Sequence, residues 1–195
     1  MNRSAGKIFS AFGLTQLVMI LAIGTALFLA YDPWRWGRVR EELLVRFPQV
    51  DHIEGMVLER WIAEAKAAPE KQGPLILDVR AAADFAVSHL PGASLVNVGA
   101  TPEQMLLLST ADRRDAELLR PIVLYCALGF ESSELADRLK RSGFRRVQML
   151  EGGIFRWANE RRPLVNSAGA PATEVSAGNS PHAGLLDRSI RARSQ

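Results

Sequence analysis

Between residues 52 and 165 the chain alternates short apolar runs with segments of helical period. The runs of strand length are PLILDV (74–79), SLVNV (94–98), PIVLYC (121–126) and VQML (147–150), with a further short strand near Ile53. The helical segments place their apolar residues three or four positions apart, at Val57, Leu58, Trp61, Ile62 and Ala65, at Leu135, Ala136 and Leu139, and at Ile154, Phe155 and Trp157. This alternation predicts an α/β fold, in which helices cover both faces of a central parallel sheet.

Length and charge limit the function classes. The chain has 195 residues, which is enough for one domain with appendages. Its 24 Lys and Arg against 21 Asp and Glu give a net charge of +3 that is evenly spread, so no nucleic-acid partner is predicted. The single cysteine excludes an internal disulfide and a CxxC metal or redox site. No metal and no cofactor are therefore predicted.

An uncharged run at residues 8–31 is the main feature of the N-terminal part. At about 1.5 Å per residue, a helix of this length exceeds the roughly 30 Å of a bilayer's hydrocarbon core. Arg3 and Lys7 precede the run, and aromatic rings such as Trp34 follow it. We therefore expect a short basic tail at 1–7 and a transmembrane anchor at 8–31. A secretory signal peptide is the alternative, although its apolar core is usually only about 7–15 residues long.

The basic residues on either side of this anchor indicate its orientation in the membrane. Arg35, Arg38, Arg40 and Arg46 follow the run and outnumber the basic residues before it, which favours a cytoplasmic domain in a single-pass cell-membrane protein. A short basic N-tail is also typical of the opposite arrangement. Residues 32–51 form the predicted juxtamembrane helix, with Val39, Leu43, Leu44 and Phe47 at helical spacing before Pro48.

The C-terminal stretch 166–195 has a different composition. It is rich in Ala, Ser, Gly and Pro and ends with several arginines. Few large apolar side chains are present to offset the entropy lost on ordering. We predict a flexible tail with a basic end.

Cys126 stands where the strand at 121–126 runs directly into a helix. In an open α/β sheet, ligands bind at the carboxyl ends of strands. Backbone N–H groups of the loop and the following helix N-terminus favour a thiolate, which predicts a lowered pKa for Cys126. Ser132 or Ser133 is expected to cap the helix. The predicted backbone cradle consists of Ala127, Leu128, Gly129, Phe130, Glu131 and Ser132. An inert buried thiol is the alternative.

Three consecutive segments, 75–98, 121–144 and 147–165, resemble the rhodanese sulfurtransferases. The resemblance rests on an ordered set of motifs: Asp78-Val79-Arg80, His89-Leu90-Pro91-Gly92-Ala93, Cys126, and Gly152-Gly153 followed by Trp157. It implies a single rhodanese-like domain in which Cys126 is the catalytic residue. Cys126 would take sulfane sulfur from a donor such as thiosulfate as a persulfide and pass it to a thiol or cyanide. With no second cysteine, the acceptor must be external.

Two positions depart from the family pattern. Sulfurtransferases of this family commonly have basic residues where this chain has Ala127 and Glu131. The Glu131 carboxylate either faces Cys126, raising its pKa and repelling anionic donors, or points to solvent. The second functional hypothesis is therefore a catalytically weak binding or redox-sensing module tethered to the membrane.

The remaining singled-out residues are expected to support the site, fill the core or line the pocket. Asp78 and Arg80 are expected either to form a supporting ion pair or to be surface charges. His89 is expected to be structural, Trp157 to fill the core, and Leu128 and Phe130 to line the mouth of the pocket. The six-residue loop from Cys126 to Glu131 resembles sulfur-transferring members more than the related phosphatases, whose loop is one residue longer.

Overall fold

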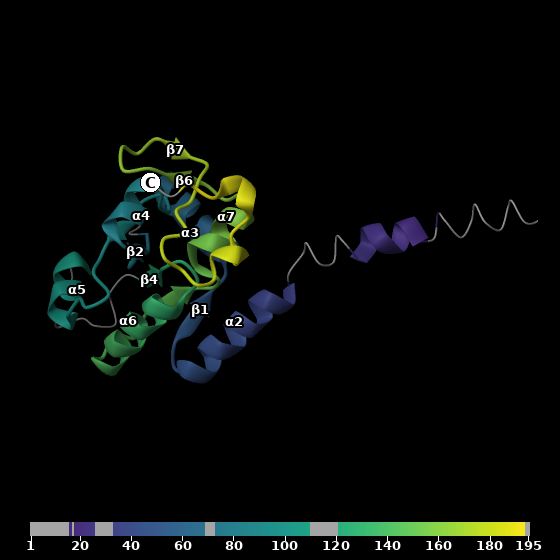
Figure 1. Ribbon diagram of the computed structural model, residues 1–195. Coiled ribbons are helices and arrows are strands. Elements are labelled where there is room, and N and C mark those ends of the chain that lie inside the picture. The colour runs from purple at the N-terminus through teal and green to yellow at the C-terminus, as the bar shows by residue number, and fades with distance from the viewer. Residues whose placement is uncertain (1–15, 17, 26–32, 69–72, 110–120, 194–195) are drawn as a thin grey trace, which may run out of the picture. The chain divides into compact units, whose positions relative to one another are not determined.

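The computed structural model describes residues 16, 18–25, 33–68, 73–109 and 121–193 (Figure 1). The chain divides into two compact units, Met1–Gly37 and Arg38–Gln195. In the smaller unit residues 18–25 are helical, and Thr25 Oγ1 donates to the Leu21 carbonyl at 2.7 Å. No helix among the described residues is long and apolar enough to cross a membrane. Most of the predicted anchor, 8–31, lies outside the described residues.

A five-stranded parallel sheet forms the centre of the larger unit. Its strands are β1 (Asp51–Ile53), β2 (Leu75–Asp78), β3 (Ser94–Leu95), β4 (Ile122–Tyr125) and β5 (Val147–Leu150). They pair in the order β1-β5-β4-β2-β3. The middle strand β4 is buried along its whole length, as expected for a strand covered on both faces. This sheet confirms the predicted α/β class.

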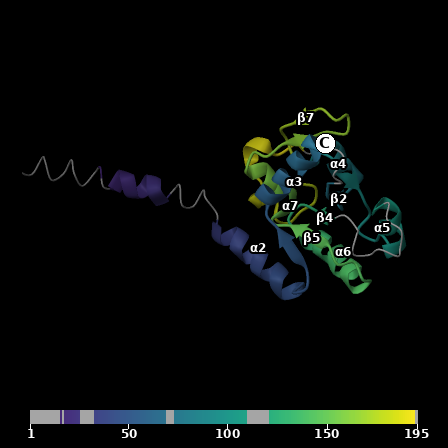
Figure 2. The same cartoon turned by 180° about the vertical axis from the view of Figure 1, so that it is seen from behind.

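Helices flank the sheet on both faces. They are α2 (Pro33–Arg46), α3 (Gly55–Ala67), α4 (Ala82–Val87), α5 (Pro102–Ser109), α6 (Phe130–Arg141) and α7 (Gly153–Asn159). Figures 1 and 2 show α2 and α6 together on one side of the sheet and α3, α4 and α7 on the other. The helical periods that we identified correspond to α3, α6 and α7. The short helices α4 and α5 were not predicted, because α4 has few large apolar residues and those of α5 form one continuous run without a helical period.

The predicted juxtamembrane helix exists as α2, and from Arg38 onward it belongs to the larger unit. Its side chains Val39, Leu43 and Phe47 are buried, whereas Leu44 is 41% exposed. The Leu43 side chain reaches the loop after Cys126, because a Cβ added to Gly129 would lie 3.0 Å from Leu43 Cδ1. The C-terminal part of α2 is thus an integral part of the domain, and not only a connection to it.

The stretch from residue 166 to residue 193 differs from the flexible tail that its composition suggested. It contains β7 (Pro171–Ala172), paired with β6 (Leu164–Val165), and two 3₁₀ turns, η1 (Ala183–Leu185) and η2 (Arg188–Ile190). Val175 and Leu186 are 0% and 1% exposed. We call residues 173–193 the C-terminal strap. In Figures 1 and 2 the strap lies against α7 and α3.

Polar contacts hold the strap in place where apolar burial is scarce. The Asn159 side chain of α7 donates to the Leu185 carbonyl at 2.7 Å and accepts from the Asp187 N–H at 2.9 Å. Within the strap, the Val175 and Ala192 N–H groups bond to the Ile190 and Val175 carbonyls at 2.7 and 2.9 Å. The strap is therefore ordered although it has few large apolar residues, because the rest of the domain supplies hydrogen-bonding partners and a surface to pack on.

Candidate functional site

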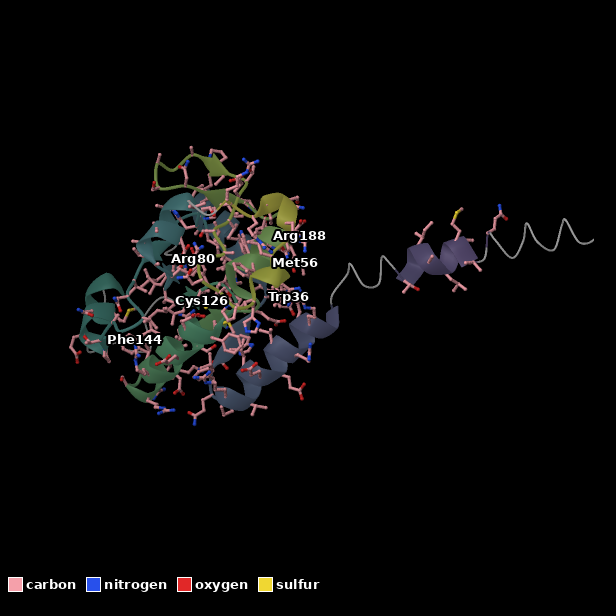
Figure 3. The ribbon with its side chains drawn as sticks, viewed as in Figure 1. Trp36, Met56, Arg80, Cys126, Phe144 and Arg188 are labelled. Carbon is pink, nitrogen blue, oxygen red and sulfur yellow. The ribbon has the colours of Figure 1, made fainter. Side chains whose placement is uncertain are left out.

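Cys126 lies directly after β4, at the carboxyl end of the middle strand, and its thiol is free. The residue is 1% exposed. Figure 3 shows it in the interior of the domain, with Arg80 near it. The topology thus places the lone cysteine where the sequence predicted it, at the edge of the sheet where ligands bind in α/β folds.

One group of the loop and one of the first turn of α6 donate hydrogen bonds to the sulfur. The Gly129 N–H lies 3.0 Å from Cys126 Sγ, and the Ser132 hydroxyl lies 3.7 Å from it. Gly129 has φ +127°, a conformation that favours glycine because it has no Cβ. Within the predicted cradle, Gly129 supplies the backbone donor and Ser132 a side-chain donor. The serines do not cap α6: its N-cap is Gly129, without a side-chain cap, and Ser132 and Ser133 lie in its first turn.

The Gly152-Gly153 turn fixes the other side of the loop. The N–H groups of Ile154 and Phe155 in α7 donate to the Cys126 and Ala127 carbonyls at 3.0 and 3.1 Å. A Cβ on Gly153 would collide with both carbonyl oxygens, so only glycine permits this close approach. The motif that carried the family resemblance thus holds the backbone of the cysteine loop.

Burial raises the pKa of Cys126 to about 11, and the second cause is the charge of the Glu131 carboxylate. Glu131 also raises this pKa by hydrogen bonding to the thiol, while hydrogen bonds from Ser132 act in the opposite direction. The expectation of a lowered pKa is therefore wrong, because desolvation disfavours the thiolate more than the loop donors favour it. Glu131 is an exposed residue that lines the cavity beside Cys126, so it is open to solvent while its charge still acts on the thiol.

Asp78 and Arg80 form a buried ion pair beside the site. Arg80 Nη2 lies 2.7 Å from Asp78 Oδ2, and Arg80 Nε donates to Oδ1 at 3.0 Å. The two side chains are 0% and 4% exposed, so the alternative of surface charges is wrong. Arg80 Nη2 also donates to the Ser88 carbonyl at 2.6 Å. The pair therefore ties the end of β2 to the segment after α4, in the supporting role predicted for it.

The other singled-out residues divide into structural residues and pocket residues. His89 stacks on Phe85 with ring centroids 3.8 Å apart and bonds through Nδ1 to the Phe85 carbonyl at 2.9 Å, which confirms a structural role. Trp157 is buried and donates to the Pro163 carbonyl at 2.8 Å. Leu128 and Phe130 line the pocket as expected. No group of three or more metal-binding side chains occurs in the described part of the chain.

A cavity of about 500 Å³ opens at Cys126. The cysteine loop contributes Ala127, Leu128, Phe130 and Glu131 to its wall, and the segment after β2 contributes Val79, Arg80, Ala81 and Asp84. The strap contributes Ser176–His182, and α2 contributes Glu42 and Arg46. The His182 ring stacks on Phe130 at a centroid distance of 5.9 Å. Neither the strap nor α2 was predicted to reach the site, since no local pattern in either segment indicates what it packs against.

The chain is similar to several known proteins over part of its length. It is 31% identical over 88 residues to the probable adenylyltransferase/sulfurtransferase MoeZ of Mycobacterium tuberculosis, covering 45% of this chain and 21% of that protein. It is 26% identical over 102 residues to the uncharacterized protein YibN of Escherichia coli K12, covering 52% of this chain and 68% of that protein. The match thus spans only about a fifth of the length of MoeZ.

The chain is also similar, at low identity, to several solved structures. A thiosulfate sulfurtransferase from Pseudomonas aeruginosa has a TM-score of 0.46 and 21% identity, covering 75% of this chain and 24% of that one. A rhodanese-related protein from Thermoplasma volcanium has a TM-score of 0.44 and 20% identity, covering 59% and 97%. The family model described as Rhodanese-like domain matches residues 62–160. This range includes β2 to β5, the Asp78–Arg80 pair and the Cys126 loop, and the chain belongs to the rhodanese-like domain family.

Proposed function

We propose that this protein is a sulfurtransferase that carries a sulfane sulfur as a persulfide on Cys126. One observation carries the proposal: the Cys126 sulfur accepts a hydrogen bond from the Gly129 N–H and borders a cavity of about 500 Å³. A persulfide formed on Cys126 would extend into that space. Membership of the rhodanese-like family and the low-identity similarity to a probable sulfurtransferase support this chemistry.

The reaction is a covalent transfer in two steps. In the first, Cys126 Sγ attacks the outer sulfur of a persulfide donor, R–S–SH, as the S–S bond of the donor breaks. The thiol proton of Cys126 goes to the leaving sulfur, which departs as R–SH, and Cys126 becomes a persulfide. In the second, an acceptor thiol attacks the outer sulfur of that persulfide and restores the Cys126 thiol. The acceptor is external, because Cys126 is the only cysteine.

Because the pKa of Cys126 is about 11, the resting sulfur is a thiol near neutral pH. A proton must therefore leave the sulfur as the bond to the donor forms. The Glu131 carboxylate, which lines the cavity beside the thiol, is placed to accept this proton and return it to the leaving sulfur. We include this relay in the proposed mechanism.

Mass spectrometry of the intact chain tests the proposal. After incubation of the full chain in detergent micelles with sulfane donors, we expect a mass gain of one sulfur atom on Cys126, which a thiol or cyanide removes. The Cys126→Ser variant should gain none. Absence of the mass gain with persulfides, polysulfide and thiosulfate alike would instead favour the second candidate, a binding or redox-sensing module. The raised pKa of Cys126 is the observation that favours this alternative.

We further propose that residues 8–31 anchor the chain in the cell membrane, with the rhodanese-like domain on the cytoplasmic side. Support comes from the uncharged run of bilayer length and the arginines that follow it. A cysteine at the exposed position Glu174, in a Cys126→Ser background, offers a test. An impermeant thiol reagent should label this Glu174→Cys chain only after the cells are opened. Labelling of intact cells would place the domain on the outer side.

A further inference from the structure

The charges of the cavity come from elements on opposite sides of Cys126. Three carboxylates line it: Glu42 on α2, Asp84 on α4 and Glu131 on α6. Two guanidinium groups, those of Arg46 and Arg80, also line it, and His182 of the strap is the remaining titratable side chain apart from Cys126.

Both arginines are matched by a carboxylate. The bidentate contact with Asp78 offsets the charge of Arg80 inside the domain. Arg46 stands one helical turn after Glu42 on α2, so that wall contains one charge of each sign. Asp84 accepts a hydrogen bond from the Ser176 hydroxyl of the strap. Together with Asp78, four carboxylates stand against two guanidinium groups among the described lining residues and their partners, so two negative charges are unmatched.

Glu131 is the carboxylate next to the reacting atom. It acts on Cys126 both through its charge and through a hydrogen bond to the thiol. It lies at the position where a basic residue would attract an anionic donor. An anion brought to the sulfur must approach this carboxylate, whereas a cation would be attracted to it.

We propose that the cavity selects sulfur compounds by charge and that its donors are small persulfides with an ammonium group two carbons from the sulfur, the β-aminothiol class. This inference rests on the proposed function of Cys126. In such a molecule the ammonium lies close to its own sulfur. A carboxylate that lines the cavity beside Cys126 is therefore within reach of the ammonium when the donor sulfur meets Sγ. Oxyanion donors such as thiosulfate are disfavoured by the same carboxylate.

Two thiol reagents of similar size and opposite charge test this selection without any sulfur transfer. The full chain in detergent at pH 7 is treated with 2-aminoethyl or 2-sulfonatoethyl methanethiosulfonate, which are similar in size and opposite in charge. Each rate on Cys126 is divided by the rate on the same chain unfolded in urea. We expect the folded chain to favour the cationic reagent by about tenfold. An equal normalised rate, or a preference for the anionic reagent, would overturn the inference.

Variants identify the responsible carboxylate. Glu131→Gln should reduce the cationic preference to about threefold, because one of the two unmatched charges is removed. Glu134→Gln is the matched control: it lies on the same helix, is exposed and does not line the cavity, so the preference should be unchanged. An unchanged preference in Glu131→Gln would contradict the assignment to this residue.

The rates at which different donors load sulfur onto Cys126 distinguish a failure of this inference from a failure of the proposed function. Persulfides of cysteamine and of 3-mercaptopropionate carry opposite charges on chains of similar length. The cysteamine persulfide should load Cys126 about tenfold faster, and thiosulfate should be the slowest donor. Equal loading would refute the charge selection and leave sulfur transfer in place. If no donor loads Cys126, both proposals fail.

Discussion

The cysteine loop and the C-terminal strap border the same cavity but reach their places for different reasons. The loop connects a fully buried strand, β4, to an amphipathic helix, α6, so its position follows from elements that are visible in the local sequence. The strap contains few large apolar residues and is positioned by contacts with residues far away in the chain, such as Asn159. Local sequence therefore places the reactive atom, while distant segments determine how accessible it is.

The largest effect is expected for the Asp78–Arg80 ion pair, which lies beside the cysteine loop. Asp78→Asn leaves the Arg80 charge without a counter-charge in a site where both side chains are at least 96% buried. The free energy of unfolding should fall by about 3–5 kcal/mol, measured by urea denaturation. Asp137→Asn is the control, because its partner Arg141 is 73% exposed and the loss should stay below about 1 kcal/mol. Similar losses in the two variants would contradict the buried pair's role.

The strap should control access to Cys126. Leu186 is 1% exposed, so Leu186→Asp places a carboxylate in an apolar site and should detach the strap from the domain. Alkylation of Cys126 by the neutral reagent iodoacetamide at pH 7 is then expected to accelerate by about tenfold. Leu44→Asp serves as control, since Leu44 is 41% exposed. If both variants react like the parent chain, the strap does not close the site.

The pH dependence of alkylation tests whether the surroundings of the cysteine loop raise the pKa of Cys126. The thiolate is the reactive form, so a raised pKa means that the rate keeps increasing with pH and levels off near 11, not near the pKa of about 8.5 of a free cysteine. In Glu131→Gln the rate should level off at a lower pH than in the parent chain, but still above about 8.5, because burial is the largest cause of the raised pKa. A parent chain that levels off near pH 8.5 would refute the desolvated thiol.

The smallest effect concerns an exposed contact of the strap. Arg161 and Asp187 are 2.6 Å apart, and their side chains are 54% and 41% exposed. Hydrogen bonds from Ser189 lower the pKa of Asp187, and Arg161 adds to this. Arg161→Ala should lower the free energy of unfolding by less than about 0.5 kcal/mol in a thermal or urea measurement, because solvent screens the pair. A loss comparable to that of Asp78→Asn would contradict the screening of this exposed pair by solvent.

Several elements of the fold were predictable because their signals are local. The runs at 121–126 and 147–150 became β4 and β5, and the period through Leu135, Ala136 and Leu139 became α6. The Asp78–Arg80 pair and the buried Trp157 also agree with the expected roles. The order of the strap could not be predicted, because Val175 and Leu186 become buried only against surfaces formed elsewhere in the chain.

By itself the sequence determined the α/β class, the family and the position of Cys126 at the end of the middle strand, since hydrophobic period and turn residues act over a few neighbours. Only the tertiary structure decided the protonation state of that cysteine and the composition of its cavity. The strap and α2 reach the cavity at the sulfur from parts of the chain far from Cys126. Desolvation depends on this burial in space, and it raises the pKa of Cys126 although the hydrogen-bond donors around the sulfur would lower it.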